Sequence, residues 1–167
     1  ILGVTIDYGP FQFMDGFDPN HICNHSDHSG RYAYARQPQA AHWHLFALGQ
    51  ALLPPIGEPD DAMAALEPYK PLFPAELDRR MAAKLGFAAP TDATRKLTGE
   101  LLTLMARERT DWTIFWRRLA HHAAGASADT VRDLFLDRAA IDRVLLQYNE
   151  LPALVGRAPE ADLMLKS

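Results

Sequence analysis

The chain opens with Ile1-Leu2-Gly3-Val4-Thr5-Ile6-Asp7, and Tyr8-Gly9-Pro10-Phe11 follows at once. A short β-branched and apolar run that ends in an acidic residue and a glycine predicts a buried strand within residues 1–9 that presents one carboxylate at its end. A carboxylate on such a rigid frame suits Mg²⁺, which prefers hard oxygen ligands, in a phosphoryl- or nucleotidyl-transfer site. An ordinary strand closed by an Asp-Xaa-Gly turn gives the same pattern. These residues alone leave both interpretations open.

Composition predicts one domain over residues 1–167 with a genuine core, because the 167 residues are 48% apolar and 23% charged. The net charge of -4 is spread without basic blocks, which argues against nucleic acid as a partner. The sequence has no apolar run near the roughly 20 residues that span a bilayer, so no membrane partner is expected. The single cysteine, Cys23, has no second cysteine in this sequence with which to pair.

The distribution of prolines and glycines divides the chain after its first residues. Residues 10–39 contain too many of them for a regular element, so a long ordered loop is expected there. Residues 40–167 predict a helical region. The expected helices cover 39–53, ended by Pro54-Pro55; a short stretch from about 58; 74–86, begun by Pro74; 92–107; 111–123; and 127 to about 149.

The clearest helical stripe consists of aromatic and apolar residues spaced at i, i+3, i+4 and i+7: Trp112, Phe115, Trp116 and Leu119. Such a row could be a platform for a ligand. Burial of large aromatic side chains stabilises a core strongly, so core packing is the favoured interpretation.

The loop carries residue types that bind Zn²⁺, because His21, Cys23, His25 and Asp27 alternate along the chain. Structural zinc sites usually draw ligand pairs from separate elements, so a hydrogen-bonding turn around residues 24–27 is the favoured alternative. A helical interaction module without enzymatic activity, stabilised by zinc at His21, Cys23 and His25, is therefore the second hypothesis for function.

Three stretches carry a resemblance to a known family: residues 7–15 (DYGPFQFMD), 18–27 (DPNHICNHSD) and 30–34 (GRYAY). In these stretches the chain resembles the selenoprotein O (YdiU) family of protein-kinase-like proteins. The resemblance implies a mainly α fold, namely the helical C-lobe portion of a kinase-like fold with a short N-terminal strand and a long ordered loop. Residues 10–39 would then stand in the place of the kinase activation segment.

The resemblance also implies a chemistry. The family is one of protein adenylyltransferases, which move AMP from ATP onto Ser, Thr or Tyr hydroxyls of protein substrates. Asp7 matches the metal-binding Asp of the kinase Asp-Phe-Gly motif, with Tyr8 in the Phe position, so its implied role is to hold Mg²⁺ or Mn²⁺ against the nucleotide. A role implied for Cys23 is redox control of the loop through a cysteine outside this chain. A small buried apolar side chain is an equally good interpretation of Cys23.

The family's catalytic Asp, its neighbouring Asn and its phosphate-contacting residues match positions before Ile1. We therefore expect an internal fragment that has no catalytic residue of its own beyond the metal-binding Asp7 and that does not transfer AMP alone. An unpaired strand would favour self-association of such a piece. Gln12 departs from the family's usual Gly, which puts the local turn in doubt. The compartment expected from the family is cytoplasmic in a bacterium and mitochondrial in a eukaryote.

Overall fold

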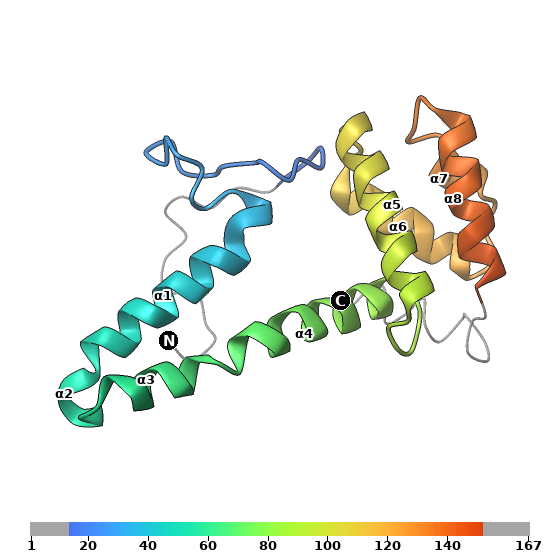
Figure 1. Ribbon diagram of the computed structural model, residues 1–167. Helices are drawn as coiled ribbons and strands as arrows, with labels where there is room; N and C mark the ends of the chain where they lie inside the picture. The colour runs from blue at the N-terminus through green and yellow to red at the C-terminus, as the bar shows by residue number, and fades with distance from the viewer. Residues whose placement is uncertain (1–13, 152–167) are drawn as a thin grey trace. The chain divides into compact units, whose positions relative to one another are not determined.

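The structure is a computed structural model that describes residues 14–151 (Figure 1). These residues are mainly helical, which confirms the predicted fold class. The predicted strand within residues 1–9 lies outside the described residues. Backbone proximity divides the chain into two compact units, one holding Asp18–Leu72 and the other Asp15–Phe17 with the residues from Phe73 onward. The expectation of one domain stays a prediction.

The first unit contains the described part of the predicted loop and then a helical pair. The loop has no regular element before the 3-10 helix η1 (Tyr34–Arg36), as predicted. It leads into α1 (Gln37–Ala51), and α1 packs against α3 (Pro59–Leu66). Asp60 and Asp61 occupy the first turn of α3, where negative charge complements the helix dipole.

Pro54 and Pro55, which were predicted to stop a helix, lie in the first turn of the next helix. Helix α1 ends at Ala51, two residues before the predicted end, and the prolines lie at the start of a separate short helix, α2 (Leu53–Ile56). Proline fits there because the N–H groups of a first turn have no partner within the helix. Gly57 ends α2 with a φ of +95°, a conformation that glycine adopts without strain.

Helix α4 (Tyr69–Lys84) corrects a second prediction about proline. The sequence places Pro74 at the start of this helix, but the helix begins five residues earlier and continues through Pro74. Proline at this position removes one hydrogen bond of the ladder, the one to the carbonyl of Lys70. The predicted end at Gly86 is confirmed, since Gly86 has a φ of +81° and the Phe87 N–H donates to the Ala82 carbonyl (2.8 Å).

The second unit is a small helical bundle of α5 (Asp92–Glu108), α6 (Trp112–Ala123), α7 (Asp129–Arg132) and α8 (Arg138–Glu150), together with the later part of α4. The predicted helices over 92–107 and 111–123 are confirmed as α5 and α6. Thr91 begins α5 with a capping box, in which its side chain and that of Thr94 satisfy each other's backbone N–H groups.

The helix predicted from Ser127 to about Asn149 is wrong in one respect, because the structure breaks it into α7 and α8. Asp137 interrupts the apolar pattern and caps α8, accepting the Ala140 N–H at 2.9 Å. Leu136, directly before this cap, is 93% exposed. A capping carboxylate therefore decides where the second helix begins, although the apolar periodicity runs across the break.

The core of the second unit is formed around the aromatic stripe of α6. Phe115, Trp116 and Leu119 are buried, which confirms core packing as their role. Phe115 meets Phe135 edge to face, with ring centroids 5.9 Å apart. The Tyr148 hydroxyl of α8 donates to the Leu85 carbonyl (3.0 Å), so the one polar atom of that buried ring is satisfied. Over residues 14–151, no helix is both long and apolar enough to cross a membrane.

Candidate functional site

Asp7, the predicted metal ligand, lies outside the described residues. The described part of the site is therefore the loop that follows it, residues 14–36, and the helical surfaces that could receive a substrate.

The start of the loop is fastened to the turn between α5 and α6. The Phe17 N–H donates to the Thr110 carbonyl (2.8 Å), and the Trp112 N–H donates to the Asp15 carbonyl (2.8 Å). Gly16 lies between these two bonds, in an isolated antiparallel bridge with Asp111. A Cβ on Gly16 would stand 2.8 Å from the backbone oxygen of Arg109, so only glycine fits without a shift. The buried Phe17 ring stacks on Trp112, with centroids 4.8 Å apart.

The middle of the loop is organised by Asp27. Its carboxylate accepts the backbone N–H groups of Tyr32 (2.8 Å) and Arg31 (2.9 Å) and the hydroxyl of Ser29 (3.3 Å). The Tyr32 N–H, above the other donors, holds the pKa of Asp27 below its usual range. Asn24 forms a similar local turn, accepting the Ser26 N–H at 3.0 Å. The hydrogen-bonding turn expected from the sequence is therefore what this segment forms.

The histidine and cysteine residues of the loop are not brought together as ligands. In the part of the chain that the structure describes, no group of three or more His, Cys, Asp and Glu side chains is placed to hold a metal ion. His21 instead links two parts of the loop that are 13 residues apart, because its carbonyl accepts the Tyr34 N–H at 3.0 Å. Cys23 is half-buried. The zinc alternative for His21, Cys23 and His25 thus finds no support in the loop's geometry.

At its far end the loop forms a pocket with the beginning of α1, which we call the loop pocket. Its volume is about 520 Å³, and it is lined by Ser29, Arg31, Arg36, Gln39, Ala40 and Trp43. The guanidinium carbon of Arg31 lies 5.0 Å from the centre of the Trp43 ring, a cation–π arrangement. Arg36 donates from Nη1 to the Ser29 carbonyl at 3.1 Å.

The loop pocket was not predicted from the sequence. In the structure the Trp43 side chain is 51% exposed. A signal was present, because Arg36, Gln39, Ala40 and Trp43 stand at i, i+3, i+4 and i+7 and so share one face of a helix. Arg31 could not have been added from spacing, since the loop must first turn back toward α1.

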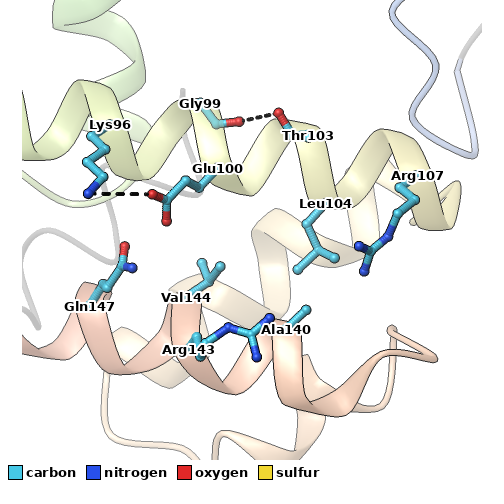
Figure 2. Close-up of a pocket in the computed structure, with 10 residues that line it drawn as sticks. All are labelled: Lys96, Gly99, Glu100, Thr103, Leu104, Arg107, Ala140, Arg143, Val144 and Gln147. Atoms are coloured by element: carbon cyan, nitrogen blue, oxygen red, sulfur yellow. Dashed lines mark hydrogen bonds and ion pairs between the residues drawn. The ribbon is translucent and has the colours of Figure 1, made fainter.

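A second cavity, of about 540 Å³, lies between α5 and α8 in the other unit (Figure 2). Leu104 and Val144 point toward one another along its floor, and charged side chains surround them. Several of these charges are paired: Lys96 lies 3.8 Å from Glu100, and Arg107 lies 2.8 Å from Asp137 outside the cavity. Among the described residues that line it there is no His, Cys or Ser, and the Thr103 hydroxyl donates to the Gly99 carbonyl. The described part of this groove therefore offers charged side chains around an apolar floor, without a His, Cys or Ser nucleophile.

Comparison with known proteins gives one consistent result. The family model described as "Protein adenylyltransferase SelO" matches residues 1–151. A relative named "Protein nucleotidyltransferase YdiU" from Variovorax paradoxus is 61% identical over 167 residues, which are 100% of this chain and 34% of the relative. The protein of the same name from Albidiferax ferrireducens is 56% identical over 171 residues, again 100% of this chain and 34% of the relative.

A third relative of that name, from Herminiimonas arsenicoxydans, is 49% identical over 89% of this chain and 30% of its own length. The chain thus spans about a third of the length of these curated relatives. The matched range includes the motif around Asp7 and every described helix. The expected resemblance is confirmed, and the chain belongs to the SelO family.

Proposed function

We propose that the protein containing this chain is a nucleotidyltransferase that moves AMP from ATP to Ser, Thr or Tyr hydroxyls of protein substrates. The observation that carries the proposal is the family match over residues 1–151, which includes the Asp7-Tyr8-Gly9 motif. The names of the relatives support nucleotidyl transfer. AMP as the moiety transferred and proteins as the acceptors are the finer part of the proposal.

In this proposal Asp7 holds Mg²⁺ or Mn²⁺ against the phosphates of ATP. A divalent cation bound there would neutralise the charge that develops on the phosphate oxygens during transfer. Among the described residues, 15–17 follow the Asp7 motif closely in the sequence, and their hydrogen bonds with Thr110 and Trp112 attach them to the packed bundle.

The experiment compares Asp7→Asn with Asp15→Asn in the full-length protein, using ATP labelled on the α-phosphate and a protein acceptor. Asp15 is a matched control because its exposed carboxylate is a few residues away in the same stretch. We expect Asp7→Asn to lower transfer by roughly a hundredfold or more, since a lost metal contact removes several kcal/mol of transition-state stabilisation. Asp15→Asn should stay close to wild type.

Binding of Mn²⁺ in the presence of ATP, followed by electron paramagnetic resonance, gives a second readout that does not depend on turnover. Asp7→Asn should weaken Mn²⁺ binding, and a folded Asp7→Asn variant with full transfer would remove Asp7 from the mechanism. We also expect no transfer by the 167-residue chain alone. Clear transfer by that chain would show that residues 1–167 suffice for activity.

A further inference from the structure

The loop pocket is a positively charged site in a chain whose net charge is -4. Of the six residues within 14–151 that line it, two are arginines and none is acidic. Among residues 14–151, neither Arg31 nor Arg36 forms an ion pair. The Asp27 carboxylate interacts with the charge of Arg31, but its oxygens already accept three hydrogen bonds from the loop.

Contacts within the first unit restrict the orientation of both guanidinium groups. Arg31 lies over the Trp43 ring at 5.0 Å, and Arg36 is tied to the Ser29 carbonyl at 3.1 Å. Each of these contacts leaves other N–H donors of the planar guanidinium directed elsewhere. The remaining N–H donors of such a guanidinium suit a carboxylate, which can accept two parallel hydrogen bonds.

The start of α1 adds to the positive potential of the pocket. Gln39 and Ala40 belong to its first turn, and this turn contains no acidic residue and no side-chain cap. The Gln37 N–H donates to the Tyr34 carbonyl and Pro38 has no N–H, so it is the helix dipole, and not a set of unpaired N–H groups, that gives this end of α1 a partial positive charge. The Trp43 side chain, 51% exposed, supplies an apolar surface on which the stem of a Glu or Asp side chain could lie.

We propose that the loop pocket binds an acidic side chain of the protein substrate, close in sequence to the hydroxyl that is modified. The proposal rests on the proposed function and names the class of substrate it would prefer, a segment with Glu or Asp near its Ser, Thr or Tyr. The occupant is argued from charge complementarity: two arginines with no acidic partner in the lining face an open volume of about 520 Å³.

The test uses the full-length protein and two acceptor peptides that differ only in Glu or Gln beside the target hydroxyl. We expect the Glu peptide to have a KM roughly tenfold lower than the Gln peptide, the effect of one charge-assisted bidentate contact. The double variant Arg31→Ala/Arg36→Ala should abolish that difference. Arg117→Ala, which removes an exposed arginine of α6, is the matched control and should keep it.

Binding is also measured with a fluorescent Glu peptide whose hydroxyl residue is replaced by Ala, so that no transfer is needed. If the full-length protein transfers no AMP but binds this peptide, and the binding depends on Arg31, the proposed function is wrong while the proposed role of the pocket is supported. If it transfers AMP yet treats Glu and Gln peptides alike, the pocket's role is overturned. A rise in the KM for ATP in the double variant, with competition between ATP and the peptide, would assign the pocket to nucleotide phosphate and likewise overturn it.

Arg31→Lys separates recognition from folding. Lysine keeps the charge but lacks the planar pair of donors, so the Glu preference should fall to an intermediate value while the circular dichroism spectrum stays unchanged. If the double variant Arg31→Lys/Arg36→Lys keeps the full preference for the Glu peptide over the Gln peptide, the pocket does not recognise the carboxylate through bidentate hydrogen bonds from arginine.

Discussion

Asp27 shows how one side chain can determine the shape of a loop that lacks regular secondary structure. Its carboxylate accepts two consecutive backbone N–H groups, those of Arg31 and Tyr32, and so turns the chain back toward α1. Without that turn Arg31 would not reach Trp43. The loop pocket therefore depends on a residue that does not line it.

The lowered pKa of Asp27 makes this turn sensitive to acid. Because the pKa in the folded state lies below the unfolded value, the stabilisation is complete above the ordinary carboxyl pKa of about 4 and is lost as the pH falls through the lowered value. We expect hydrogen-exchange protection of the Arg31 and Tyr32 amides to follow that course. Asp27→Asn should lower this protection already at pH 7, since a neutral amide is a weaker acceptor.

Asp60→Asn, which removes an exposed carboxylate of α3, is the control for this measurement and should leave both amides protected. Equal protection of the two amides in wild type and Asp27→Asn at neutral pH would show that Asp27 does not set the turn.

At the scale of elements, helix α6 has a buried face and an exposed face that can be tested against each other. Phe115 is 0% exposed and contacts Trp116 and Phe135, whereas Ile114 on the same helix is 42% exposed. Phe115→Ala should lower the free energy of unfolding by about 3–5 kcal/mol, through lost burial and the cavity left behind. Ile114→Ala should cost less than about 1 kcal/mol.

Urea unfolding of the 167-residue chain, followed by circular dichroism, measures both variants. Equal losses for Phe115→Ala and Ile114→Ala would mean that the aromatic stripe is not the centre of the core.

The helices show which sequence signals suffice for prediction. Helices α5 and α6 follow from periodicity together with a capping residue, Thr91 or Asp111, directly before the pattern. Prolines were less informative, because proline tolerates a first turn as readily as it ends a helix, and the sequence does not say which turn it occupies. The break at Asp137 was missed because a cap within an apolar pattern competes with the pattern itself.

The candidate site was predictable only in part. The local turn at Asn24–Asp27 follows from side chains that bond to their own backbone, so sequence proximity reveals it. The loop pocket requires residues 21 and 34 to meet and Arg31 to reach Trp43, contacts that no periodicity encodes. The role of Asp7 stays a prediction.

At the scale of the whole molecule, the first unit exposes many large apolar side chains. They lie on α1, α2, α3 and the start of α4: Trp43, Phe46, Leu48, Ile56, Met63 and Leu72. Large exposed apolar side chains gathered on one unit are typical of an interface.

The isolated 167-residue chain should consequently self-associate. Sedimentation velocity over a concentration series measures this, and Leu48→Glu with Leu72→Glu should shift the chain toward monomer by placing charge on the exposed apolar surface. Leu146→Glu, at an exposed position of α8, is the control. A wild-type chain that stays monomeric at every concentration would contradict the prediction.

The fastening of Asp15–Phe17 to Thr110 and Trp112 has a consequence for biosynthesis. A ribosome releases the loop long before it releases the turn between α5 and α6, and chains fold progressively as they emerge. Residues 15–17 therefore cannot form these hydrogen bonds until that turn has left the exit tunnel. A nascent chain stalled before Thr110 would carry the signature motif of its family without the anchor that holds the following loop in place.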